Sequence, residues 1–187
     1  EAPLDLDQPS LYLNRELSQL EFNFRVLAQA MDERVPILER LRYLCISCTN
    51  LDEFFEIRVA AVRHQLQFGG PLSPDGLAPT QAMKAIHSRA GELVEQQYRY
   101  WNDVLRPSLA DAGIRILGPA AWNARQKRWL QKYFRDEILP VLSPLGLDPA
   151  HPFPRILNKS LNIVVVLKGR DAFGRAGHLA IVRAPRS

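Results

Sequence analysis

The sequence predicts a mainly α fold that becomes α+β: an antiparallel helical bundle, followed by a partial α+β domain with a β-hairpin. Apolar residues recur at i, i+3 and i+4 through most of residues 18–113, as in amphipathic helices. A β-branched run follows at 161–167, and a second apolar run lies at 178–182. We therefore expect a disordered lead-in (1–10), a helical domain (11–118) and a truncated second domain (119–187).

The composition is ordinary for a soluble globular protein, with 187 residues, 47% of them hydrophobic and 24% charged. No window approaches the roughly 18 uninterrupted apolar residues of a membrane span. Residues 1–10 lack a basic region followed by an apolar one, so we expect no signal peptide and a cytoplasmic protein.

Charge is unevenly distributed along the chain. Residues 1–70 hold 7 Lys/Arg and 11 Asp/Glu, whereas residues 71–187 hold 17 and 9. A basic second part suits a polyanionic partner such as nucleic acid, polyphosphate or a phosphorylated ligand. A solvated basic face would give the same counts, and charge alone does not separate the two.

The first helix is expected to begin at a capping box, Ser18-Gln19-Leu20-Glu21, and to end near Met31. Pro36 is suited to the first position of the next helix. That helix is expected to reach a polar joint made by Ser47, Thr49 and Asn50.

At this joint, Asn50 with Glu53 reads as a second capping box, which opens a new helix that runs to about Phe68. One interpretation is a helix–helix corner, and the other is a binding site at a helix start, where backbone N–H groups are free. Asp52, Glu53 and Glu56 then complement the helix dipole more readily than they perform acid–base chemistry.

Gly69-Gly70-Pro71 is expected to end this helix, and Thr80 to cap a long one that Pro107 bends and Gly113 ends. Residues 114–117 read as a short strand or an extended linker. Asn123 and Gln126 then form a third capping box, opening a helix over 123–139.

This last helix is expected to have one apolar, buried side and one basic side. The apolar side holds Trp129, Leu130, Tyr133, Phe134 and Ile138, and the basic side holds Arg125, Lys127, Arg128, Lys132 and Arg135. Prolines make residues 140–154 irregular, and the buried strand at 161–167 pairs with 178–182 as a hairpin. Because a two-stranded ribbon is marginal in water, helix 123–139 or sequence absent from this chain must cover it.

No constellation of catalytic residues is evident. The four histidines (64, 87, 151 and 178) share no metal-ligand spacing, and there is no phosphate-binding glycine loop or nucleophile elbow. Cys45 and Cys48 have the C-x-x-C spacing of redox or metal sites, but within a helical pattern we interpret them as buried thiols. A binding or assembly module fits these observations better than a complete enzyme.

Several segments together resemble the bacterial polyphosphate kinases of the first type. They are LYLNRELS at 11–18, FNFRVL at 22–27, PILERL at 36–41, NLDEFF at 50–55 with Arg58-Val59, HPFP at 151–154 and NKSLN at 158–162. The first four lie in what resembles that family's N-terminal domain, and the last two in its head domain. The order and flanks of NLDEFF make the resemblance specific.

The resemblance implies a fragment of an enzyme that reversibly transfers the ATP γ-phosphate to polyphosphate, through a phosphohistidine and with Mg²⁺. It implies a homo-oligomer, dimer or tetramer, whose partners are ATP, ADP and polyphosphate, with no nucleic acid. The phosphohistidine and the metal ligands belong to C-terminal domains, so no catalytic or metal-binding residue is expected in this chain. The fragment alone is expected to be inactive.

One functional residue carries over from the family, where the asparagine before Leu-Asp-Glu-Phe contacts ATP; here it is Asn50. Many relatives have Ser-Asn-Asn where this chain has Cys48-Thr49-Asn50, so a hydroxyl replaces one amide. The alternative, from the basic charge after residue 70, is a stand-alone helical module with a nucleic-acid-binding face.

Overall fold

The structure is a computed structural model that describes residues 5–147, 152–169 and 179–185. The chain divides into two compact units, residues 1–116 and 117–187, and each is described by itself. Among the described residues, no helix has the length and apolar character needed to cross a membrane.

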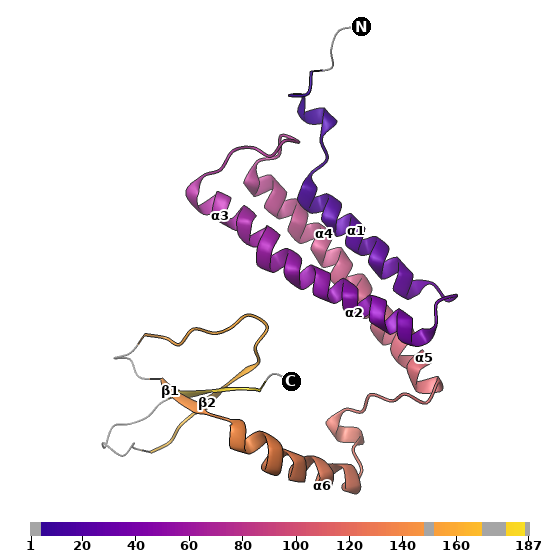
Figure 1. Cartoon of the computed structure of the whole chain (residues 1–187), viewed down its shortest axis with the longest axis vertical. Helices are drawn as coiled ribbons and strands as arrows, with labels where there is room; N and C mark the ends of the chain where they lie inside the picture. Colours follow the sequence, from indigo (N-terminus) through magenta and orange to yellow (C-terminus); the bar gives the residue numbers. More distant parts are fainter. Residues whose placement is uncertain (1–4, 148–151, 170–178, 186–187) are drawn as a thin grey trace. The chain divides into compact units, whose positions relative to one another are not determined.

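The first unit is a bundle of antiparallel helical rods (Figure 1). After a 3-10 turn, η1 (Pro9–Leu11), the first rod is α1 (Arg15–Met31). The second rod joins α2 (Ile37–Glu53), the π-helical η2 (Phe54–Val59) and α3 (Ala60–Phe68). The third joins α4 (Pro79–Tyr100), the π-helical η3 (Trp101–Leu105) and α5 (Arg106–Asp111). The predicted antiparallel bundle is confirmed.

The core of this unit lies between the three rods. Leu20 and Leu27 of α1 and Ile86 and Leu93 of α4 are each at most 1% exposed. Spacings of seven residues place each pair on one helix face, two turns apart. The bundle is therefore held by the amphipathic pattern from which it was predicted.

The predicted helix corner at Asn50 is wrong, because α2 continues through Asn50 into η2. The Asn50 carbonyl accepts from the Phe54 N–H, as in a helix interior. Up to Phe54, buried residues recur at the three- and four-residue spacing of an α-helix. The next buried residue, Val59, comes five positions after Phe54 rather than four. The wider π turn returns Val59, and not Arg58, to the core face. A second π turn, η3, bridges the same five-residue step from Tyr100 to Leu105.

Two predicted helix caps are displaced, one by four residues and one by two. The cap of α1 is Asn14, whose Oδ1 accepts from the Leu17 N–H at 3.0 Å, and not Ser18. The earlier start brings Leu17 into the helix, where it packs against the core. Before α4 the cap position is Ala78, and Pro79 occupies the first turn ahead of Thr80. The predicted ends hold: Gly69 and Gly113 have φ of +76° and +85°, values that favour glycine.

The second unit begins with helices and ends in a sheet. Its helical elements are η4 (Pro119–Ala121), α6 (Ala124–Tyr133), the π-helical η5 (Phe134–Ile138) and η6 (Leu139–Val141). The predicted capping box is confirmed, since Asn123 Oδ1 accepts from the Gln126 N–H and Gln126 Oε1 from the Asn123 N–H, both at 2.9 Å. Residues 114–117 form an extended linker without a strand.

The sheet has three antiparallel strands in the order β1-β3-β2. Strand β2 (Asn162–Val166) pairs with β3 (Leu179–Arg183) as predicted, and His178 lies outside the described residues. Strand β1 (Pro144–Leu147) was not predicted, because the proline-rich run was expected to be irregular. A proline is tolerated as the first residue of an edge strand, which is the position of Pro144.

The prediction of a buried apolar side on the last helix is wrong for the described residues. Trp129, Tyr133 and Phe134 are 61%, 46% and 49% exposed. Strand β2 is not buried either, since Ile163 to Val166 are all exposed. The helix therefore does not cover the hairpin, and in the described part of this unit only Ala180 and Ile181 are buried.

Candidate functional site

Asn50 lies in the last turn of α2 and is half-buried. Because the residue is in the helix interior, its side chain caps no backbone N–H. Within the described residues the carboxamide forms no hydrogen bond, so its donors and its acceptor are available to a ligand. The predicted role of Asn50 as a helix cap is therefore wrong, and its contact with a ligand stays a prediction.

The preceding turn of α2 is fixed by a buried polar cluster, which we define as Asn23, Ser47 and Gln97. Gln97 Nε2 donates to Ser47 Oγ at 2.8 Å, and Asn23 Nδ2 donates to the Ser47 carbonyl at 2.9 Å. All three residues are buried, and they come from α1, α2 and α4, respectively. The cluster therefore ties α2 to both neighbouring helices three residues before Asn50. The helical spacing of apolar residues could have placed Ser47 on the core face. It gave no indication that Asn23 and Gln97 are the hydrogen-bond partners of Ser47.

A groove of about 410 Å³ lies beside this turn, between α2 and the third rod. It is lined by Leu41, Leu44, Cys45, Cys48, Thr49, Gln97, Tyr98 and Trp101. Both cysteines are exposed, so the prediction of buried thiols is wrong. Partial desolvation, with smaller effects from Cys45 and Asp52, raises the pKa of the Cys48 thiol. A raised pKa disfavours the thiolate that redox and metal chemistry need.

A second cavity, of about 490 Å³, lies between η2–α3 and α4. It is lined by Phe55, Val59, Ala60, Arg63, Leu66, Met83 and His87. The Phe55 and His87 rings are tilted by 39° with centroids 6.5 Å apart. Ring faces and a guanidinium group suit a planar or anionic ligand group. The sequence placed Phe55 and Val59 in the family motif, but it did not indicate that they line a cavity with His87.

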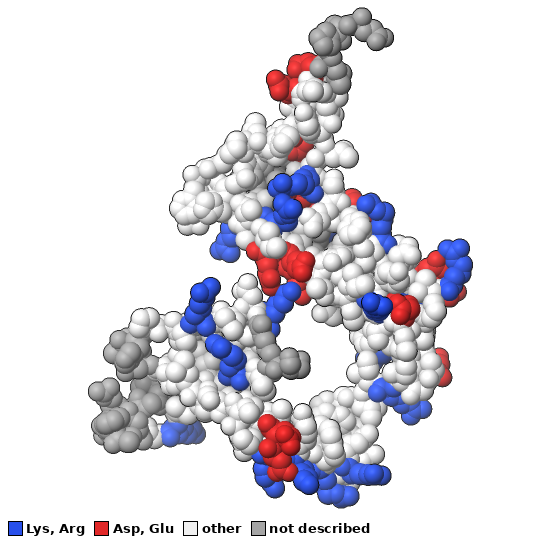
Figure 2. Space-filling view, in the orientation of Figure 1, with Lys and Arg blue, Asp and Glu red and all other residues white. Residues whose placement is uncertain are grey.

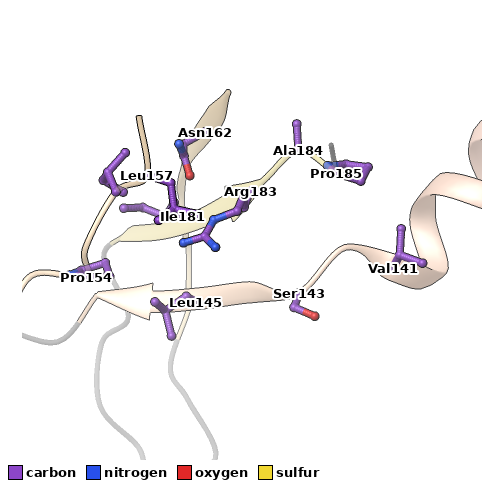
Figure 3. Close-up of a pocket in the computed structure, with 11 residues that line it drawn as sticks. Val141, Ser143, Leu145, Pro154, Leu157, Asn162, Ile181, Arg183, Ala184 and Pro185 are labelled. Atoms are coloured by element: carbon purple, nitrogen blue, oxygen red, sulfur yellow. The ribbon is translucent and has the colours of Figure 1, made fainter. Parts of the chain in front are cut away.

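The second unit carries a separate cavity of about 550 Å³ against its sheet. Figure 3 shows Arg183 of β3 reaching over it, with Leu145 and Ser143 on one side and Leu157 on the other. Asn162 donates to the Ser160 carbonyl and to Ser160 Oγ, while its Oδ1 is buried and has no partner among the described residues. This cavity is mostly apolar, with one cation at its edge.

The described residues of the two units do not gather the groups that a metal site requires. Among the described residues there is no cluster of three or more His, Cys, Asp or Glu side chains that could hold a metal ion. His64 packs on Phe68 at 4.6 Å and His87 on Phe55, whereas His151 and His178 lie outside the described residues. Asp52, Glu53 and Glu56 lie within the continuous second rod and not at a helix start, so their predicted role at a helix N-terminus is wrong.

Comparison with known proteins matches the two units to two domains of the same enzyme family. Residues 12–117 match the polyphosphate kinase N-terminal domain, and residues 125–187 match the polyphosphate kinase middle domain. The chain is 72% identical over 179 residues to the polyphosphate kinase of Xylella fastidiosa strain 9a5c, covering 96% of this chain and 26% of that protein. It is 52% identical over 182 residues to that of Pseudomonas aeruginosa PAO1, covering 97% and 26%.

The fold also matches a solved structure. The crystal structure of polyphosphate kinase from Porphyromonas gingivalis superposes with a TM-score of 0.71 at 28% identity, over 94% of this chain and 27% of that one. The chain thus spans about a quarter of the length of the relatives it matches.

Proposed function

The chain belongs to the polyphosphate kinase family, and we propose that it is the N-terminal part of an enzyme that reversibly transfers the ATP γ-phosphate to polyphosphate. In this proposal it supplies one wall of the nucleotide site and an assembly surface for a homo-oligomer. In the same proposal the phosphohistidine and the Mg²⁺ ligands belong to parts of the parent protein outside this chain, as the resemblance to the family implies. We further propose that the family's two domains meet at about residue 118 of this chain.

The proposal of a nucleotide-binding wall rests on the surroundings of the Asn50 side chain. Its carboxamide is free of helix capping and of hydrogen bonds within the described residues, on a turn fixed by the Asn23–Ser47–Gln97 cluster. An amide offers two donors and an acceptor, a set that matches an adenine edge or a ribose hydroxyl. A fixed helix turn presents such a group without the loss of backbone entropy that a loop would incur.

The test is Asn50→Ala in the parent enzyme, measured by the steady-state kinetics of ATP use. Loss of one desolvated hydrogen bond costs about 1–3 kcal/mol, so kcat/KM for ATP should fall roughly 5- to 150-fold. Asn102→Ala is the matched control, since Asn102 is an exposed asparagine in η3. Unchanged ATP kinetics in a folded Asn50→Ala enzyme would remove Asn50 from the nucleotide site.

The activity itself is tested at the level of the parent protein. The parent should convert ATP to polyphosphate, whereas the 187-residue chain should show no transfer. Transfer by the chain alone would contradict the assignment of the chemistry to other domains. The stand-alone nucleic-acid-binding module is not favoured, because both units match domains of one enzyme family.

A further inference from the structure

The outer surface of α6 carries a line of positive charge. Arg125, Arg128 and Lys132 of α6 and Arg135 at the start of η5 follow one another at intervals of three, four and three residues, which places them along one side of this continuous helix. At 1.5 Å per residue this basic stripe is about 15 Å long. Figure 2 shows blue side chains gathered over α6 on the face in view. In the sequence, the acidic pair Asp136 and Glu137 follows directly, in η5.

The four cations of the basic stripe are exposed, and none forms an ion pair with another described residue. Several arginines of the first unit differ in this respect. Arg34, Arg89 and Arg99 are bonded to Asp32, to Glu21 and to Glu95, respectively. The charges of the stripe are therefore free to bind a ligand, whereas those of the first unit are partly neutralised by their own neighbours.

We propose that the basic stripe binds inorganic polyphosphate and so holds the polymer on the second unit. The proposal rests on the proposed function for its ligand. A row of guanidinium and ammonium groups binds successive phosphates and reads no base, so it matches a polymer that carries charge at every unit and nothing else. Trp129 and Tyr133, stacked at 5.3 Å, flank the stripe and make RNA the competing ligand that the experiment must exclude.

The experiment measures binding of end-labelled polyphosphate by the 187-residue chain, by fluorescence anisotropy over a range of salt concentrations. The stripe variant is R125Q/R128Q/K132Q/R135Q, and the control is R25Q/K84Q/R99Q/R106Q, four exposed cations of the first unit. Each variant loses four positive charges, so the formal net charge of +4 becomes zero in both. Circular dichroism verifies that both remain folded.

The stripe variant should bind at least tenfold more weakly at low salt. Its log–log salt slope should fall by about 3–4, roughly one for each phosphate that the stripe no longer neutralises. The control should retain wild-type binding. If polyphosphate binding is weakened equally in the two variants, net charge alone explains the effect and the proposal is overturned. So would tighter binding of a homopolymeric RNA than of polyphosphate of matched charge.

The same variants in the parent enzyme separate this proposal from the proposed function. If the parent makes polyphosphate, the stripe variant should raise KM for polyphosphate and shorten the product, with KM for ATP unchanged. If the stripe variant has the same KM for polyphosphate and the same product length as the control, the stripe does not bind polyphosphate in the enzyme. If the parent makes no polyphosphate while the chain still binds it through the stripe, the proposed function fails and the binding site stands.

Discussion

Ser47 lies one helical turn before Asn50 and joins α2 to both neighbouring helices. Its hydroxyl accepts from Gln97 Nε2 and its carbonyl from Asn23 Nδ2, at a site that is 0% exposed. In Ser47→Ala, Gln97 Nε2 would remain buried without its acceptor, so we expect a loss of about 1–3 kcal/mol in the free energy of unfolding. Urea denaturation measures this loss. Ser88→Ala, on an exposed position of α4, is the control, and equal stability of the two variants would contradict the role of the cluster.

Asp32 follows the end of α1 and titrates under the influence of Arg34. Hydrogen bonds from the Arg34 side chain, and then from its backbone N–H, lower the pKa of Asp32 from 3.8 to about 2. Because the folded-state pKa is depressed, the interaction stabilises the fold above pH 3.8, and its contribution disappears as the pH falls through about 2.

Carboxyl ¹³C NMR in acid measures this titration. Arg34→Gln should raise the Asp32 midpoint towards 3.8, whereas Arg42→Gln, which breaks the separate ion pair with Glu39, should leave it in place. A midpoint near 3.8 in the unmodified chain would show that the Asp32–Arg34 interaction does not persist in solution.

At the scale of elements, the π turns adjust the phase of two long helices. Phe54 and Val59 are separated by five residues, and Ile57 between them is 63% exposed. Deleting Ile57 should convert η2 into ordinary α-helix, with Val59 four positions after Phe54 and still on the core face. Deleting the exposed Arg42 should instead rotate Leu41 and Leu44 out of phase with each other.

Thermal unfolding followed by circular dichroism compares the two deletions. The Ile57 deletion should unfold cooperatively with a small fall in Tm, and the Arg42 deletion should lose most of its cooperative transition. If both deletions are equally damaging, η2 does not act as a phase adjustment.

These elements also show how far the sequence could predict the structure. The helix ends at Phe68 and before Gly113, the Asn123 cap and the β2–β3 pair were predictable, because glycine conformation, capping and β-branching act locally. The corner at Asn50 was mispredicted because a π turn and a helix cap both interrupt the apolar period of the sequence. The two are distinguished only by whether the helix continues, which the structure shows and the sequence does not. The partners of Ser47, from α1 and α4, could not be predicted, since no local rule specifies which helices meet.

At the scale of the whole chain, the two units bury their apolar residues to different degrees. The first unit encloses a connected core, whereas in the described part of the second only Ala180 and Ile181 are buried and Trp129, Phe134 and Val166 stay exposed. Burial of apolar surface is the main source of folding free energy, at about 25 cal/mol per Å². The first unit is therefore expected to fold by itself, and the second to need further partners for its apolar surface.

Separate expression of residues 5–116 and 117–187 tests this difference. The first piece should show a strongly helical spectrum and a cooperative thermal transition, because its core includes Leu20, Ile86 and Leu105 at 1% exposure or less. The second should melt without a clear transition and should bind an apolar dye, since small sheets need a covered face to be stable in water. A cooperative transition without dye binding in the second piece would mean that its exposed apolar residues are covered in solution, by self-association or by repacking, and sedimentation would separate these two.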